Sequence, residues 1–376
     1  MHLGINAIRF TRRFTGVGRY MECLLKEWSQ MDIPFDKVTL YAHTPLKQEE
    51  LAFPLERYHV KVVGRKVPDP LWEWWTLPSQ AKNLDALFCP SFTIPFGYPG
   101  KCLVTYHGPT ERTLGTYQWW RMHAYELLYW YSARKADQVC TVSHSVEKRL
   151  IEVFKIPPQK ITVTYNAPHE AFRPIHDMDL LEQKKKQYIG GNNPFILFVG
   201  KLIPRHYLPN LLKAFARVKM SKRLPHHLLL VGPDNLNLNI PARAKKLGVG
   251  DSVVHIPYVV FKDLPLLYNA AEIFIYPSSE TEGFGIPVIE AMACGTPVIT
   301  VNCGGLRDFA PGAALMTQSS TVLELQDALE KMIFDSDLRK DLASKGLERS
   351  KAFTWRVTAE KTMEVLWKLA QGQSAG

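Results

Sequence analysis

Short apolar runs rich in β-branched residues alternate with longer amphipathic segments along the whole chain. Short apolar runs separated by helical segments are typical of parallel strands whose sheet is covered by helices on both faces. The pattern therefore predicts an α/β fold with two doubly wound parallel sheets. Strands are expected at 3–8, 37–42, 59–63, 86–89, 102–106, 138–142 and 161–165, and then at 195–200, 227–231, 253–256, 273–276, 297–301 and 313–316.

The alternation is interrupted after Pro174. A charged segment follows and ends in Gly190-Gly191-Asn192-Asn193-Pro194, a composition typical of a linker. The chain has 376 residues, and a single core stops growing at about 250–300 residues. We therefore predict one domain over 1–174, a second over 175–354, and a terminal helix within 355–376 that has no strand after it and must dock on a sheet already formed.

The composition is that of an ordinary globular protein, with 46% hydrophobic and 22% charged residues, and excludes disordered, collagen-like and coiled-coil chains. No uncharged apolar stretch of about 18 residues is present, so no transmembrane helix is predicted. The N-terminus is too polar for a signal-peptide core, and we expect the protein in the cytoplasm. The cysteines form no C-x-x-C pair and are expected to be reduced core residues: Cys23, Cys89, Cys102, Cys140, Cys294 and Cys303.

The net charge is +10, which is compatible with nucleic acid or an anionic membrane surface as a partner. Because the excess is spread along the chain and forms no basic stripe, we expect no nucleic-acid partner. Attraction to anionic lipid or to a phosphorylated ligand stays open. Aromatic residues are concentrated at 71–75 and 117–131, where packing in the core and between the domains is favoured over a carbohydrate platform or a membrane-interface belt.

The segment from Pro277 to Ile299 is the richest in potential chemistry. A predicted strand ends at Pro277, and a loop with Gly283 and Gly285 follows. A helix is expected to begin near Gly285 and to end at Gly295. Backbone N–H groups at a helix start lack partners and lie at the positive end of the helix dipole. They can therefore bind an anion or several hydroxyl oxygens, and the glycines allow the ligand to approach closely.

Two of the carboxylates in this segment are candidates for ligand binding, Glu282 in the loop and Glu290 about one turn inside the helix. Helical side chains lean toward the helix N-terminus, so both can face one cleft. Ionised carboxylates suit the vicinal hydroxyls of a sugar or a ribose, because each accepts from two donors. The structural alternative, a solvated Glu282 and a Glu290 that serves the helix dipole, stays open on these residues alone.

The run Glu-Gly-Phe-Gly-x-Pro-x-x-Glu-Ala-Met-Ala-Cys-Gly-Thr-Pro-Val, residues 282–298, resembles the signature of the retaining nucleotide-sugar glycosyltransferases of family 4, the group 1 glycosyltransferases. The resemblance covers nearly the whole chain. It implies the GT-B fold, in which two Rossmann-like domains face a central cleft. The first domain would take the acceptor and the second the nucleotide-sugar donor, and the terminal helix would pack back on the first.

Further landmarks of the family lie in the expected order. Gly16 and Gly18, within Thr15-Gly16-Val17-Gly18-Arg19-Tyr20, resemble the glycine loop that lies against the donor diphosphate. On the residues alone, a strand-to-helix turn without a ligand is the favoured interpretation of that loop. His107, in Thr105-Tyr106-His107-Gly108, resembles the histidine beside the transferred sugar, although Gly108 replaces the aspartate that usually follows it.

Three basic residues occupy the strand–turn–helix that holds the pyrophosphate in the family. Lys201 and His206 stand where relatives usually have Arg and Lys, and Arg205 is adjacent. Arginine binds phosphate with a planar fork, lysine is a point charge, and histidine is charged only when protonated. We expect Arg205 to neutralise much of the leaving group. The resemblance further implies catalytic roles for Glu282, His107, Arg205 and Lys201, and donor contacts from Gly16, Gly18, Lys201, Arg205, His206, Glu282, Gly283, Phe284, Gly285, Ile286 and Glu290.

The function implied is transfer of a hexose, with retention of configuration and without a metal, from a nucleoside diphosphate sugar to a hydroxyl acceptor. That acceptor would be a saccharide or a lipid-linked intermediate in cell-envelope polysaccharide or glycolipid synthesis. No cofactor is expected besides the nucleotide sugar as co-substrate. The alternatives are a nucleotide-sugar isomerase or phosphorylase on the same fold, and a non-catalytic sugar-nucleotide binder. The location expected is the cytoplasm, or the inner face of the membrane as a peripheral protein.

Overall fold

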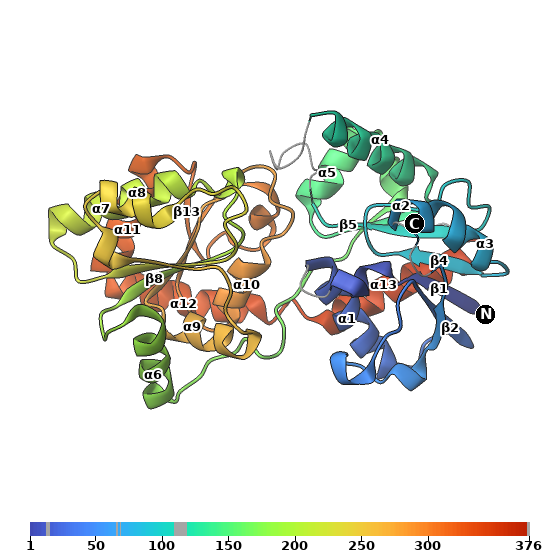
Figure 1. Ribbon diagram of the computed structural model, residues 1–376, viewed down its shortest axis with the longest axis horizontal. Coiled ribbons are helices and arrows are strands. Elements are labelled where there is room, and N and C mark those ends of the chain that lie inside the picture. The colour runs from blue at the N-terminus through green and yellow to red at the C-terminus, as the bar shows by residue number, and fades with distance from the viewer. Residues whose placement is uncertain (13–15, 65–66, 68, 109–118, 374–376) are drawn as a thin grey trace. The chain divides into compact units, whose positions relative to one another are not determined.

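The computed structural model describes residues 1–12, 16–64, 67, 69–108 and 119–373 of the chain (Figure 1). Thr15 of the glycine loop, and Tyr117 and Gln118 of the second aromatic segment, lie outside the described residues. The chain divides into two compact units, the first formed by residues up to Asn166 together with the segment from Thr354, and the second spanning Ala167–Phe353. The chain therefore passes into the second unit after Asn166, whereas the sequence prediction placed this boundary after Pro174.

The first unit is built on a parallel seven-stranded sheet with the order β3-β2-β1-β4-β5-β6-β7. Its strands are β1 (His2–Asn6), β2 (Lys37–Ala42), β3 (His59–Val62), β4 (Ala86–Cys89), β5 (Cys102–Tyr106), β6 (Gln138–Thr141) and β7 (Ile161–Val163). Its helices are α1 (Gly16–Ser29), α2 (Asp69–Leu71), α3 (Leu77–Gln80), α4 (Trp119–Lys135), α5 (His144–Glu152) and α13 (Trp355–Ala370).

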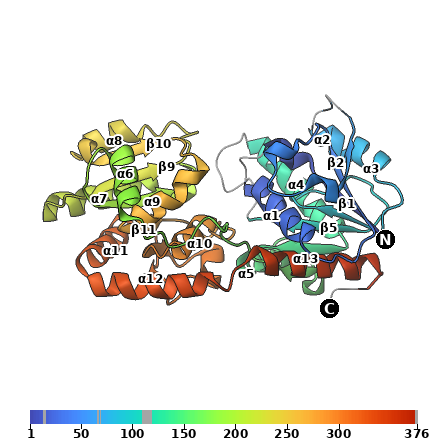
Figure 2. The ribbon, with the colours of Figure 1, turned by 90° about the horizontal axis from the view of Figure 1, so that it is seen from below.

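The last helix, α13, packs against α1 and against strands β4, β5 and β6 of the first unit (Figures 1 and 2). Thr354 caps the helix by accepting a hydrogen bond from the Val357 amide. Trp28 Nε1 of α1 donates to the Ala359 carbonyl at 3.0 Å, and Thr358 donates to the carbonyl of Tyr165. Helix α13, the last described helix, is therefore part of the first unit.

The second unit carries a parallel six-stranded sheet with the order β10-β9-β8-β11-β12-β13. Its strands are β8 (Phe195–Val199), β9 (His227–Val231), β10 (Val253–Ile256), β11 (Ile273–Tyr276), β12 (Val298–Val301) and β13 (Leu315–Thr317). Its helices are α6 (Met178–Ile189), α7 (Leu208–Lys222), α8 (Ile240–Lys246), α9 (Leu264–Ala270), α10 (Ile286–Ala293), α11 (Val322–Phe334) and α12 (Ser336–Ser350). Helix α7 packs against α11, and α10 against α12.

The two doubly wound parallel sheets predicted from the sequence are confirmed, and the differences are at strand ends. The expected strand 3–8 ends at Asn6, because the Asn6 carboxamide oxygen accepts a hydrogen bond from the Ile8 amide and turns the chain into a 3-10 segment. The expected strand 313–316 is shifted to Leu315–Thr317. The six cysteines are buried and free, as predicted.

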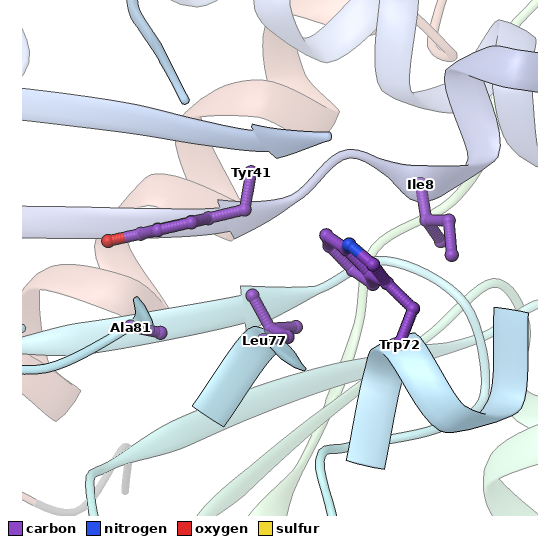
Figure 3. Packing of buried hydrophobic residues seen from close by; sticks show 5 residues of the cluster. All are labelled: Ile8, Tyr41, Trp72, Leu77 and Ala81. Carbon is purple, nitrogen blue, oxygen red and sulfur yellow. The ribbon is translucent and has the colours of Figure 1, made fainter. Parts of the chain in front are cut away.

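The aromatic segment 71–75 divides between the core and the surface. Trp72 packs among Ile8, Tyr41 and Leu77 (Figure 3), and its indole N–H donates to the Val63 carbonyl at 2.8 Å. Trp75, in contrast, is 64% exposed. Core packing is therefore confirmed for Trp72, whereas Trp75 lies outside the core of its unit. Among the described helices, none is long and apolar enough to cross a membrane.

Candidate functional site

The candidate site of the second unit lies at the carboxyl ends of its strands, where open parallel sheets bind ligands. The turn after β8 supplies Lys201, Arg205 and His206, and the loop after β11 supplies Ser278 and Glu282. The neighbouring strand β12 ends in a turn that contains Gly304 and Gly305. Strands β8, β11 and β12 are adjacent in the sheet, so these segments meet at one edge.

Glu282 is the centre of this group and is only 6% exposed. Its Oε2 atom accepts hydrogen bonds from Ser278 Oγ at 2.9 Å and Tyr276 OH at 3.2 Å. His206 Nε2 and Arg205 Nε lie 3.8 and 3.9 Å from the same oxygen. Burial alone would raise the pKa of Glu282, but the Arg205 guanidinium, His206 and Ser278 lower it to about 2. The carboxylate is therefore ionised at neutral pH.

The other carboxylate oxygen of Glu282, Oε1, accepts no hydrogen bond from any described residue. It is also not among the polar atoms that are both fully buried and without a partner. One oxygen of this carboxylate is thus held by protein groups, while the second is available to a ligand. A sugar hydroxyl is a suitable donor to such an oxygen.

The backbone of the Glu282 loop rests on two glycines that sequence reasoning missed. The Gly305 amide donates to the Glu282 carbonyl at 2.9 Å. A Cβ atom at Gly305 would lie 2.1 Å from the Gly283 carbonyl oxygen, and one at Gly304 would lie 2.4 Å from the Glu282 carbonyl oxygen. The only signal in the sequence is a Gly-Gly pair shortly after a buried strand. Its meaning depends on β12 lying beside β11.

Helix α10 begins directly after this loop. Gly285 is its N-cap residue, with a left-handed φ of 92°, and a Cβ there would meet Leu306 Cδ2 at 2.5 Å. The amides of Gly285 and Ile286 have no acceptor within the described part of the chain, so they can bind a ligand. The Phe284 ring packs against Phe309 at a centroid distance of 4.8 Å, which leaves only its backbone for a ligand.

Glu290 lies in the middle of α10 and is 3% exposed. The hydroxyl of Tyr268, on α9, donates to Glu290 Oε2 at 3.2 Å. Burial and the nearby Glu290 carboxylate raise the pKa of Tyr268 well above its usual value, so its hydroxyl keeps its proton. Glu290 is therefore held in place by a neutral donor within the same unit.

The three basic residues of the β8 turn differ in their surroundings. The Lys201 side chain is exposed and forms no ion pair with any described residue, whereas its carbonyl accepts from His206 Nδ1 at 2.6 Å. His206 is 2% exposed. Arg205 Nη1 donates to the Thr281 carbonyl at 3.4 Å. Arg205 and His206 thus meet the Glu282 loop, and the Lys201 backbone holds the His206 ring.

The remaining predicted residues belong to the first unit. Gly16 and Gly18 lie in the first turn of α1, and a Cβ at Gly16 would meet open space. His107 follows β5, and its Nε2 donates to the Pro90 carbonyl at 2.6 Å. Burial lowers the pKa of His107 to about 4, so the ring is neutral and its Nδ1 is left as an acceptor. No described residue donates to this Nδ1.

Two family models match the chain and together cover most of it. The model described as Glycosyltransferase Family 4 matches residues 14–168, and the model described as Glycosyl transferases group 1 matches residues 180–349. The chain belongs to glycosyltransferase family 4. The long signature of residues 282–298, which carried the predicted resemblance, lies within the second match.

Curated relatives of this family 4 chain include the O-antigen chain mannosyltransferase B of Escherichia coli, which is 28% identical over 233 residues. That match spans 62% of this chain and 61% of the relative. The D-inositol 3-phosphate glycosyltransferase of Nocardia farcinica is 28% identical over 259 residues, spanning 64% of this chain and 55% of the relative. The matches thus span less than two thirds of the length of these relatives.

The solved structures similar to the family 4 chain show its fold. HepE of Anabaena, in complex with UDP-glucose, superimposes with a TM-score of 0.77 at 16% identity, over 98% of this chain and 99% of HepE. A glycosyltransferase from Rickettsia africae gives a TM-score of 0.74 at 19% identity, over 99% of both chains. The predicted GT-B fold, with two Rossmann-like units, is confirmed.

Proposed function

We propose that this family 4 chain is a retaining, metal-independent glycosyltransferase that moves a hexose from a nucleoside diphosphate sugar to a hydroxyl acceptor. The observation that carries the proposal is the ionised, buried Glu282, with one oxygen held by protein groups and the other available, in a loop that Arg205 contacts and that leads into the free amides of Gly285 and Ile286. That combination suits a ligand with sugar hydroxyls next to an anionic leaving group.

In the proposed reaction the donor C1–O bond to the diphosphate breaks, and a bond forms between C1 and the acceptor oxygen on the same face. The acceptor proton passes to the leaving phosphate, so no protein nucleophile is needed. Lys201, Arg205 and the amides of Gly285 and Ile286 stabilise the charge that develops on the diphosphate. Glu282 Oε1 accepts a hydrogen bond from the donor sugar and stabilises positive charge at C1. NMR of the anomeric carbon in the product tests whether its configuration is retained.

Two further assignments are proposed, one in each unit. Glu290 accepts from the ribose hydroxyls, and the neutral His107 offers Nδ1 to a sugar hydroxyl. Because several relatives are named mannosyltransferases, we propose mannose as the sugar and GDP-mannose as the first donor to test. The relatives named for the O-antigen chain support a saccharide or lipid-linked acceptor of the cell envelope.

A thermal-shift and calorimetry panel tests the donor class. Purified protein is titrated with UDP, GDP, ADP and dTDP and their common sugar conjugates. A ligand that binds only the folded state at about 100 times its Kd stabilises it by about 2.7 kcal/mol, so one nucleotide is expected to raise Tm by several degrees. Glu290→Ala abolishes this shift. The control Glu348→Ala, at an exposed residue that forms an ion pair with Lys351, retains it. If none of these compounds raises Tm, the proposal is contradicted.

We also propose that the exposed face of α4 contacts an anionic membrane. Leu127 and Phe96 are 64% and 61% exposed, and the Phe96 ring stacks on Tyr131 at 5.2 Å. The Arg134 guanidinium lies 5.1 Å from the Trp130 ring centre. Aromatic and aliphatic side chains next to basic ones are typical of proteins that lie at the membrane interface.

Vesicle sedimentation tests this contact. The protein is expected to sediment with vesicles of phosphatidylglycerol and phosphatidylcholine, less so at high salt, and not with phosphatidylcholine alone. The double substitution Leu127→Ser and Phe96→Ser is expected to reduce the bound fraction several-fold. Equal binding of this variant and the wild type would show that another surface is used.

A further inference from the structure

A chain of hydrogen bonds links His206 to Glu282 through the hydroxyl of Tyr276. His206 Nδ1 lies 2.6 Å from the Lys201 carbonyl oxygen, and His206 Nε2 lies 3.1 Å from Tyr276 OH. Tyr276 OH in turn lies 3.2 Å from Glu282 Oε2. Nothing in the signature of residues 282–298 points to Tyr276, which precedes it at the end of β11.

The position of the Tyr276 hydroxyl is fixed by packing. Its ring lies nearly parallel to Phe198 at 5.8 Å and to Phe274 at 6.1 Å, with interplanar angles of 13° and 17°. The side chain is 3% exposed, and burial, with the Glu282 charge, raises its pKa well above the usual value. The hydroxyl is therefore a neutral donor with one proton at a fixed place.

The protons available to this chain determine how many of its bonds can form together. A carbonyl only accepts, so His206 Nδ1 carries a proton toward Lys201. An ionised carboxylate only accepts, so Tyr276 gives its single proton to Glu282. The Tyr276 oxygen can then bond His206 only by accepting a proton from Nε2. All three bonds coexist when His206 is an imidazolium, and one is lost when Nε2 is bare.

The other ionisable groups near His206, Tyr276 and Glu282 fit the same two states. Arg205 Nε lies 3.4 Å from His206 Nε2 in a contact that requires a bare Nε2, and 3.9 Å from Glu282 Oε2. Cys303, in the β12 turn, stays a neutral thiol because burial raises its pKa to about 12. Loss of the Nε2 proton therefore directs Arg205 to His206, and its presence leaves the guanidinium to Glu282 and a ligand.

We infer that Tyr276 is a positioning residue that holds Oε2 of Glu282 and makes the orientation of this carboxylate depend on the proton of His206. The inference rests on the proposed function and adds a pH dependence to it. With Nε2 protonated, Oε1 faces the donor sugar and Arg205 faces the diphosphate. Without that proton, the single lone pair of Nε2 accepts from Arg205 or from Tyr276, the group that donates to it turns away from Glu282, and turnover falls.

The test compares Tyr276→Phe, His206→Lys and the control Tyr188→Phe, which removes a hydroxyl that donates to Asp263 in the same unit. The assay is release of GDP from GDP-mannose, or of UDP from UDP-glucose if that compound stabilises the protein. Wild-type kcat is expected to fall at alkaline pH, and the lysine variant keeps its kcat there because lysine stays charged. Tyr276→Phe is expected to lower kcat about tenfold and to change KM less than about threefold. In this variant, kcat is expected to decrease by less than about twofold at alkaline pH.

Proton uptake on binding gives a readout that does not require turnover. Calorimetry of the same ligands at pH 7 in buffers of different ionisation enthalpy is expected to show proton uptake by the wild type and none by His206→Lys. The control keeps the wild-type kcat and pH profile. A purely structural Tyr276 would lower Tm in Tyr276→Phe and leave the pH profile unchanged, which overturns the inference, as does equal proton uptake by wild type and His206→Lys. Absence of both binding and turnover in the wild type overturns the proposed function and this inference with it.

Discussion

Glu282→Gln is expected to reduce kcat at least about 100-fold while the affinity for the nucleoside diphosphate changes less than about threefold. The substitution keeps the shape of the side chain and removes the charge that faces the developing positive charge on the sugar. Affinity is little changed because Arg205 and the α10 amides, which contact the diphosphate in the proposed reaction, remain. Steady-state kinetics and calorimetry with the nucleoside diphosphate measure the two effects separately.

Glu280→Gln is the matched control for that variant. Glu280 belongs to the same loop but is exposed and paired with Arg307, and glutamine can still accept from this arginine. Its kcat is expected to stay within about threefold of the wild type. Glu282→Gln with a kcat as high as that of the control would exclude Glu282 from the reaction.

Gly305→Ala is expected to reduce kcat by at least about 30-fold, because a displacement of about 1 Å can cost about 100-fold in rate. The added Cβ would lie 2.1 Å from the Gly283 carbonyl oxygen, a backbone atom, so the Glu282 loop has to move. The effect arises although residue 305 itself contacts no reacting atom. Kinetics and thermal unfolding of the variant measure the loss of turnover against any loss of stability.

Gly191→Ala provides the comparison, since a Cβ there would have no heavy atom within 4 Å and the residue has no positive φ. It is expected to keep wild-type kcat and Tm. A Gly305→Ala enzyme that keeps at least half of the wild-type kcat would show that the two loop segments can separate without moving the Glu282 carboxylate.

The strands were predictable because parallel strands buried on both faces read as short apolar runs, and the signature loop followed one of them. The start of α10 at Ile286 was predictable from the two glycines and Pro287. The support from Gly304 and Gly305 was not, because it depends on β12 lying beside β11 in the sheet. Strand order follows from packing, and local sequence does not contain it.

The surroundings of His206 show a different limit of the sequence. Its place in the motif suggested a side chain that faces the pyrophosphate, yet in the structure both ring nitrogens are engaged by Lys201 and Tyr276. The sequence indicates Tyr276 only as the last residue of the strand expected at 273–276. Strand and turn propensities describe the backbone, whereas a hydrogen-bonded chain depends on where side chains from separate strands meet.

The docking of α13 on the first unit has a consequence for biosynthesis. The hydrogen bond between Trp28 and Ala359 and the one between Tyr165 and Thr358 can form only after the ribosome has translated the whole second unit. Until then, the apolar surface of β4, β5 and β6 against which α13 packs is uncovered in the nascent first unit. Folding of the second unit can finish earlier, so the part of the protein synthesised first is completed last.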